Sequence, residues 1–195
     1  MPEHDKAPQR GHAVEGETVS APEPLNEAHG LSDFSCGNPV LDRWLKARAL
    51  SNQQKGFTVV IVVHEAGRVV GYYGLAPTAV VPSVMPRSIR TGQPPDPVPC
   101  LLLGQLATDT AWAGRGIGTG LVRHALERSV QAAGLIGGRA LVVNAVDEAA
   151  ALFWQRRGFL PSRDDPLVLF RSIAIIAASL AEARKQGATS SSAQR

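Results

Sequence analysis

A glycine-rich turn at residues 114–120 has the residue types best suited to a binding site in this sequence. It reads GRGIGTG, follows the apolar segment CLLLGQLATD (100–109) and opens an amphipathic helix. Glycines let a backbone approach a ligand closely, and the unpaired N–H groups at a helix N-terminus attract negative charge. The turn therefore predicts an anion site, with tight helix packing as the purely structural alternative.

Two common phosphate motifs do not match this turn. A P-loop requires Lys and then Ser or Thr after its last glycine, and Thr119-Gly120-Leu121 does not supply them. The dinucleotide fingerprint has a third glycine where this chain has Leu121. A pyrophosphate site of a third kind remains.

The other reactive side chains show no metal or redox pattern. Cys36 and Cys100 match no zinc or CxxC spacing, so we predict two free thiols in a reducing compartment. The histidines are scattered at positions 4, 12, 29, 64 and 124, and we predict no metal site.

The segments around the turn alternate between helix and strand patterns. Asn38-Pro39 predicts the start of a helix over 39–54. Ala66-Gly67 joins two β-rich runs, 57–65 and 68–77, as a hairpin. A proline-rich loop at 82–99 precedes the strand 100–109. The remaining expected elements are a helix at 116–133, a strand at 139–145, a helix at 147–157 capped by Asp147, a strand at 166–173 and a helix to about 185. The fold class is α/β, with a mixed central sheet and flanking helices.

Composition sets the boundaries of this domain. Residues 1–24 are polar and aperiodic and predict a disordered leader, 25–186 the domain, and 187–195 a disordered tail. The chain outside the leader holds 18 basic and 12 acidic residues, which suits an anionic cofactor or RNA, or a solvated basic surface. We find no signal peptide and no membrane-spanning run, which predicts a cytoplasmic protein.

At this point the sequence resembles the GNAT acetyltransferases. Residues 113–118 are similar to the family's Gln/Arg-x-x-Gly-x-Gly/Ala turn, and DEAAALFWQRRGF (147–159) to its D/N-E-x-A-x-x-F-Y-x-x-x-G-F segment. The resemblance implies the GNAT fold and acetyl-CoA as co-substrate, with no metal. The residues that it implies for binding acetyl-CoA are Leu106, Ala107, Thr108, Ala113, Gly114, Arg115, Gly116, Ile117, Gly118 and Thr119.

A narrower resemblance covers about residues 25–172. Segments 35–53, 67–77, the approach to 109 and 165–170 look like the acetyltransferase toxins of type II toxin–antitoxin systems. This implies acetylation of the α-amine of aminoacyl-tRNA, a ribbon-helix-helix antitoxin and a homodimer. Basic residues that could contact RNA are Lys46, Arg48, Arg87, Arg90 and Arg157, although a solvated surface explains them equally well.

Several positions depart from the family pattern. Trp154 stands where the family has a tyrosine that protonates the leaving thiolate, and an indole cannot replace a phenol in that role. Tyr73 is our candidate substitute, with Tyr72 and Ser162 as others. Val59 and Gln105 replace arginines of the related toxins, and Ala113 replaces the first residue of the turn.

These departures predict a slow enzyme and leave two alternatives. One is a GNAT enzyme that acetylates a small-molecule or protein amine. The other is a degenerate domain that binds acetyl-CoA without turnover.

Overall fold

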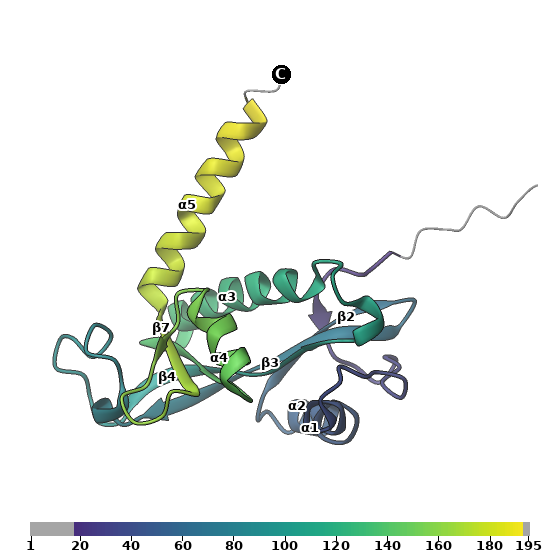
Figure 1. Cartoon of the computed structure of the whole chain (residues 1–195), viewed down its shortest axis with the longest axis horizontal. Helices are drawn as coiled ribbons and strands as arrows, with labels where there is room; N and C mark the ends of the chain where they lie inside the picture. The colour runs from purple at the N-terminus through teal and green to yellow at the C-terminus, as the bar shows by residue number, and fades with distance from the viewer. Residues whose placement is uncertain (1–17, 193–195) are drawn as a thin grey trace, which may run out of the picture.

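The computed structural model describes residues 18–192, in which seven strands form one mixed sheet in the order β1-β2-β3-β4-β5-β7-β6 (Figure 1). The strands are β1 (Glu23–Pro24), β2 (Val59–Glu65), β3 (Arg68–Val80), β4 (Val98–Thr108), β5 (Ala140–Asn144), β6 (Leu160–Pro161) and β7 (Val168–Ser172). β4 and β5 run parallel, and the other neighbouring pairs are antiparallel.

Helices cover both faces of the sheet. They are α1 (Pro39–Trp44), a π-helical turn (Leu45–Ala49), α2 (Leu50–Gln54), α3 (Ile117–Ile136), α4 (Glu148–Gln155) and α5 (Ile173–Ser192), with short 3₁₀ turns at Pro82–Val84 and Thr110–Trp112. Figure 1 shows α3 and α4 on one face and α1 and α2 on the other. Two large apolar clusters match this division, because α3 and α4 share one cluster and the first helical segment belongs to the other.

Local sequence explains why these elements form where predicted. The Asn38 side chain accepts hydrogen bonds from the backbone N–H groups of Val40 and Leu41, and Pro39 opens the helix, as expected of an N-cap pair. The helix predicted over 39–54 is confirmed, with a π-helical turn inside it that buries Leu45 and Ala49. The hairpin at 66–67 and the helices that begin near 117 and 148 are confirmed as well.

The domain boundaries expected at 24 and 187 differ from the structure. Glu23 and Pro24 form β1 against β2, and the Ser20 N–H donates to the His64 carbonyl at 2.8 Å, so the ordered chain begins before 25. α5 continues through Gly187 to Ser192, because each added helical residue contributes a hydrogen bond once the helix is formed. The rest of the predicted leader, 1–17, and residues 193–195 lie outside the described residues. None of the described helices is long and apolar enough to cross a membrane.

Candidate active site

The sheet opens between β4 and β5. These parallel strands pair only at Leu101–Leu103 with Leu141–Val143, and among the described strands β4 then pairs with β3 alone. In sheets with parallel strands, ligands bind beyond the carboxyl ends where neighbouring strands diverge. A cavity of about 90 Å³ lies there, and we refer to it as the divergence cavity. It is lined by Leu41, Leu103, Gln105, Leu106, Val143, Asn144, Ala145, Val146, Ala150 and Trp154.

A β-bulge in β4 shapes the entrance to this cavity. Gly74 faces Gly104 and Tyr72 faces Ala107, so Gln105 and Leu106 together stand opposite the single residue Tyr73. Gln105 has a φ of 59°, in the left-handed region that few residues other than glycine adopt. The bulge and the end of pairing with β5 free one edge of the β4 backbone from Gly104 to Thr108.

The glycine-rich turn begins α3 beside this free edge. Gly116 is the N-cap of α3 with a φ of 82°, and no side chain caps the helix. The first intrahelical bond runs from the Gly120 N–H to the Gly116 carbonyl at 3.0 Å, so the preceding amides of the first turn have no helical acceptor. An added Cβ at Gly114, Gly116 or Gly120 would meet no atom within 4 Å, so the turn is open to a ligand. An added Cβ at Gly118 would lie 3.3 Å from the Thr108 hydroxyl, so the turn and the β4 end are adjacent.

Two buried residues between β4 and α3 fix the turn, and neither was predicted from the sequence as a site residue. Asp109 is 2% exposed, and its carboxylate accepts from the backbone N–H groups of Ala111 at 2.9 Å and Ser35 at 3.1 Å. Trp112 is buried in the apolar cluster under α3, and the Arg115 guanidinium lies 4.4 Å from its ring centroid. The Asp-x-x-Trp spacing directly after the strand is the sequence pattern that could have indicated these two residues.

Trp154 forms one wall of the divergence cavity. Its side chain is 7% exposed and meets Phe153 and Phe159 edge to face, with ring centroids 5.1 and 5.2 Å away. Among the described residues that line this cavity, none is Asp, Glu, His, Cys, Lys, Arg or Tyr. The cavity walls therefore offer no side chain that could transfer a proton near neutral pH.

The hydroxyls considered as substitutes for the family tyrosine do not reach the divergence cavity. Tyr73 lines a different cavity under α3, and its hydroxyl lies 2.9 Å from His124 Nδ1. Burial raises the pKa of Tyr73, which makes its proton less available. The Tyr72 hydroxyl donates to the Leu41 carbonyl, and the Ser162 hydroxyl donates to the Val84 carbonyl. The assignment of Tyr73 as substitute acid is not supported by this geometry.

A second cavity adjoins the first on the α1–α2 side of the sheet. It measures about 170 Å³, and we refer to it as the groove. Trp44, Asn52, Phe57, Thr58, Gly74, Ala76, Leu102, Gly104 and Gln105 line it, so Gln105 is the residue shared by the two linings. An added Cβ at Gly74 would lie 3.2 Å from the Thr58 hydroxyl, so glycine keeps the groove open there.

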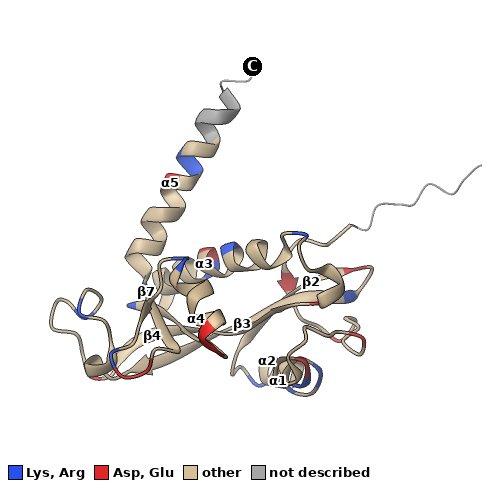
Figure 2. Cartoon of the chain, in the orientation of Figure 1, with Lys and Arg blue, Asp and Glu red and all other residues tan. Residues whose placement is uncertain are grey.

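The basic residues expected to contact RNA do not form one patch. Lys46 and Arg48 are exposed on the π-helical turn, whereas Arg87 and Arg90 lie in the proline-rich loop. Figure 2 shows these two segments toward opposite ends of the sheet. Arg157 is bound locally, since its guanidinium lies 3.4 Å from the Phe153 ring centroid and Nη1 donates to the Phe153 carbonyl at 3.0 Å. None of these five cations lines the divergence cavity, although Leu41 of α1 does.

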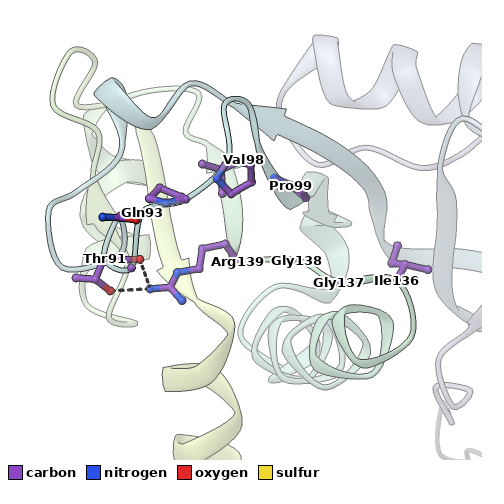
Figure 3. A pocket seen from close by; sticks show the side chains of 11 residues that line it. Thr91, Gln93, Val98, Pro99, Ile136, Gly137, Gly138 and Arg139 are labelled. Carbon is purple, nitrogen blue, oxygen red and sulfur yellow. Dashed lines mark hydrogen bonds between the residues drawn. The ribbon is translucent and has the colours of Figure 1, made fainter.

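A larger cavity lies at the other end of β4. It measures about 360 Å³ and is lined by the proline-rich loop and residues 136–139, at the amino ends of β4 and β5 (Figure 3). Arg139 is the titratable side chain in this lining, and it donates to the Ile89 carbonyl at 2.8 Å and to the Thr91 hydroxyl at 2.8 Å. These bonds hold the loop, and the cavity is remote from the uncapped α3 terminus.

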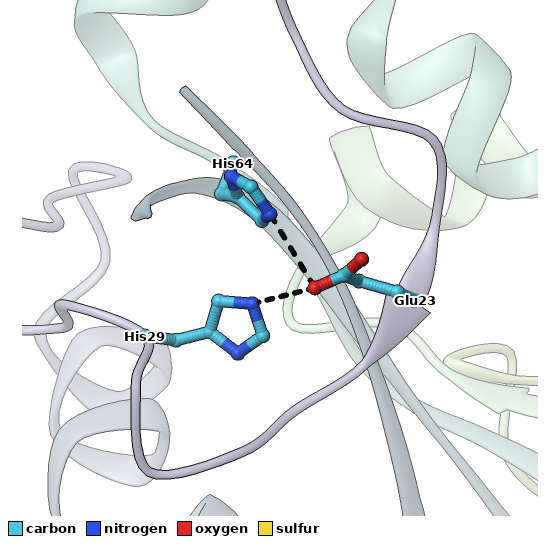
Figure 4. A group of neighbouring side chains, drawn as sticks. All are labelled: Glu23, His29 and His64. Atoms are coloured by element: carbon cyan, nitrogen blue, oxygen red, sulfur yellow. Dashed lines mark hydrogen bonds and ion pairs between the residues drawn. The ribbon is translucent and has the colours of Figure 1, made fainter. Parts of the chain in front are cut away.

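Two of the histidines lie together in the structure, although their positions in the sequence suggested that all five are scattered. His29 and His64 both direct Nε2 at Glu23 Oε1, at 2.9 and 3.4 Å (Figure 4). Each Nδ1 accepts a backbone N–H, from Asn26 at 3.0 Å and from Gly67 at 3.1 Å. In a neutral imidazole the proton is then on Nε2, which leaves no lone pair there for a metal. The three side chains fit a clamp between β1 and the β2–β3 hairpin, in which Glu23 accepts a hydrogen bond from His29 and makes a longer polar contact with His64, and they do not fit a metal site.

The two cysteines are free thiols, as predicted. Burial, together with a hydrogen bond to Asp42, raises the pKa of Cys36 to about 11, and burial also raises the pKa of Cys100. Neither thiol is therefore activated as a nucleophile.

The family match, the related sequence and the similar solved structures all concern acetyltransferases. Residues 25–159 match the Acetyltransferase (GNAT) family. A tRNA-acetylating toxin of Mycobacterium tuberculosis (strain ATCC 25618 / H37Rv) is 43% identical over 150 residues, which cover 77% of this chain and 90% of that protein. AtaT complexed with acetyl-methionyl-tRNAfMet has a TM-score of 0.76 at 25% identity, over 84% of this chain and 99% of that chain.

A tyrosine-to-phenylalanine variant of the toxin AtaT, bound to the C-terminus of the antitoxin AtaR and acetyl-CoA, is also similar. Its TM-score is 0.68 at 25% identity, over 82% of this chain and 96% of that chain. The predicted fold class is thereby confirmed.

Proposed function

The chain belongs to the GNAT acetyltransferase family, and from that premise we propose that it is a toxin that acetylates the α-amine of aminoacyl-tRNA and so blocks translation. It is an acetyl-CoA-dependent N-acetyltransferase by family. The choice of aminoacyl-tRNA rests on the relative that acetylates tRNA, whose similarity extends over 77% of this chain. In the structure, the observation that supports transfer at this place is the divergence of β4 from β5 beside an uncapped α3.

The residues present fit acetyl-CoA. The open turn at 113–119 would hold the pyrophosphate through backbone N–H groups, assisted by the partial positive charge of the α3 N-terminus. The free edge of β4 at 106–108 would hold the pantetheine arm and direct N–H groups at the acetyl carbonyl. Acetyl-CoA supplies an acetyl group activated as a thioester.

The chemistry requires little from protein side chains. The amine nitrogen bonds to the acetyl carbon, the bond from that carbon to sulfur breaks, the nitrogen loses a proton and the thiolate gains one from water. Holding the two reactants in line supplies the proximity effect. An α-amine has a pKa of about 8, so a useful fraction is neutral near pH 7.5 without a protein base. The lining of the divergence cavity offers no acid, and we therefore expect slow turnover.

The alternatives differ in their acceptor. A small-molecule or protein amine would use the same cavity and the same acetyl-CoA site, and a degenerate domain would bind acetyl-CoA without transfer. The tRNA-acetylating relative and the AtaT complex with acetylated tRNA both favour the aminoacyl-tRNA acceptor. Lys46 and Arg48, exposed on the π-helical turn that follows α1, are the cations that we propose contact the tRNA backbone.

We also propose the partners of such a toxin. A ribbon-helix-helix antitoxin would neutralise it, in line with the similar toxin that is bound to an antitoxin C-terminus. A homodimer would cover the apolar carboxyl end of α3, where Leu135 is 86% and Ile136 69% exposed. We place the protein in the cytoplasm, where charged tRNA is found.

The test of this function is release of coenzyme A by the purified chain from acetyl-CoA and a pool of charged tRNA. Release should depend on the charged tRNA and should leave an acetylated, base-stable amide on the aminoacyl group. Release without tRNA dependence, or none from tRNA but some from a small amine, would overturn the proposal. Light scattering of the same preparation tests the dimer.

A further inference from the structure

We propose that Gln105 is the residue that positions the acceptor amine, by accepting a hydrogen bond from its N–H through the side-chain oxygen. This inference rests on the proposed function and names the residue that guides the substrate within it. In this role the neutral side-chain amide of Gln105 holds the attacking amine where the groove meets the divergence cavity.

The position of Gln105 is the first support. It belongs to the linings of both the divergence cavity and the groove, which lie on either side of the opened sheet. The free edge of β4 that would bind acetyl-CoA runs on from this residue. An amine that reaches the acetyl group through the groove therefore passes the Gln105 side chain.

The hydrogen bonding of Gln105 is the second support. Its Oε1 is buried, and no group in the described part of the chain donates to it. Buried acceptors almost always have a partner, because the loss of water is otherwise uncompensated. An amine N–H is a donor of the kind that this oxygen lacks.

The backbone at Gln105 is the third support. Its φ of 59° lies in the left-handed region, and it sits in the bulge where two residues of β4 oppose one of β3. A side chain at such a φ costs free energy, and bulges next to active sites redirect side chains. The bulge here places Gln105 in the linings of both cavities, whereas a residue of a regular strand directs its side chain to one face of the sheet.

The chemistry of an amide suits the nucleophile. A carboxylate at this place would stabilise the ammonium form and so raise the pKa of the amine, which removes the lone pair that attacks. Since neither cavity lining contains a charged side chain, the neutral Gln105 oxygen can bind the amine with little effect on its pKa.

The experiment compares wild type, Gln105→Leu and Gln105→Glu, with Gln131→Leu as the matched control. Gln131 lines the separate cavity beneath α3, so Gln131→Leu makes the same amide-to-isobutyl replacement at a place outside the proposed site. For each we would measure kcat and KM for charged tRNA across pH 6–9, and the Kd of acetyl-CoA by calorimetry.

The expected results separate positioning from folding. Gln105→Leu should lose about 10- to 100-fold in kcat/KM for charged tRNA, in the range of one lost hydrogen bond in a buried site, while the Kd of acetyl-CoA stays within twofold. Gln105→Glu should recover KM, because it keeps an acceptor oxygen, but its rate should rise at a higher pH than in wild type. Gln131→Leu should match wild type.

Two different failures are distinguishable. Wild type without turnover on charged tRNA overturns the proposed function, and with it the inference, before any variant is compared. If wild type is active and Gln105→Leu is equally active, or Gln105→Glu has the pH profile of wild type, the function stands and the role of Gln105 is wrong. A Gln105→Leu variant that loses acetyl-CoA affinity in parallel with activity would also overturn it, in favour of a structural role.

Discussion

Replacing Trp154 with tyrosine should make the enzyme faster and less stable. Trp154 forms a wall of the divergence cavity, where the described lining contains no proton donor for the leaving thiolate. A phenol at this position restores such a donor. General acid catalysis contributes typically about 10²–10⁴-fold, and we expect about 10- to 100-fold in kcat because the surrounding groups are arranged for an indole.

The same change weakens the core. The indole meets Phe153 and Phe159 edge to face, and such pairs contribute about 0.5–1.5 kcal/mol each beyond buried area. If the smaller ring loses both contacts, the free energy of unfolding falls by about 1–3 kcal/mol, which corresponds to a melting temperature lower by roughly 2–12 °C for a chain of this size.

The assay pairs Trp154→Tyr with Trp154→Phe. Both variants lose the indole, and they differ by one hydroxyl, so the ratio of their kcat values isolates the effect of the acid. Coenzyme A release would be followed at a temperature well below both melting transitions. If the tyrosine and phenylalanine variants turn over equally, the reasoning that a missing acid limits this enzyme is refuted.

Three further changes test other parts of the site. Gly116→Ala places a Cβ at a φ of 82° and should cost about 1–2 kcal/mol of stability. It should also weaken acetyl-CoA binding about tenfold, as measured by calorimetry. Unchanged affinity would contradict the role of the turn. Burial lowers the pKa of His124 below its usual value, so the stability that the neutral ring contributes is present above about pH 6.5 and is lost as the pH falls through the folded pKa. The melting temperature should therefore fall between pH 7 and 5 less steeply in His124→Gln than in wild type, and equal slopes would argue against this. Zinc should leave the melting temperature unchanged while Glu23→Ala lowers it, and a zinc-induced rise that depends on His29 would overturn the clamp.

Most of the fold followed from local patterns in the sequence. Asn38-Pro39 and Asp147 predicted helix starts because a short polar side chain before a helical run satisfies free N–H groups. β1 was missed because a segment of two residues is too short to show a strand pattern in the sequence. The continuation of α5 past Gly187 was missed because a single glycine weakens a helix without ending it.

For the candidate site, the sequence indicated features of the backbone and did not reveal features that depend on strand register. The turn at 113–119 was found because glycines before a helix report an exposed backbone. Tyr72 and Tyr73 lie on opposite faces of β3, and sequence alone does not say which face meets the reaction. The importance of Gln105 depends on a one-residue bulge, and the pairing of His29 with His64 depends on β1, so neither could be derived from spacing.

The departures from the family pattern share one physical property. Ala113, Gln105 and Trp154 all change side chains, whereas the features expected to hold acetyl-CoA are backbone features: the open turn, the uncapped α3 and the free edge of β4. A site built from main-chain N–H groups tolerates such changes, because amide direction depends on φ and ψ and on strand register. Acceptor choice and proton transfer depend on side chains, so substitutions affect them directly. Binding of acetyl-CoA should therefore be the robust property of this chain, and the rate of transfer the property that is most sensitive to residues 105 and 154.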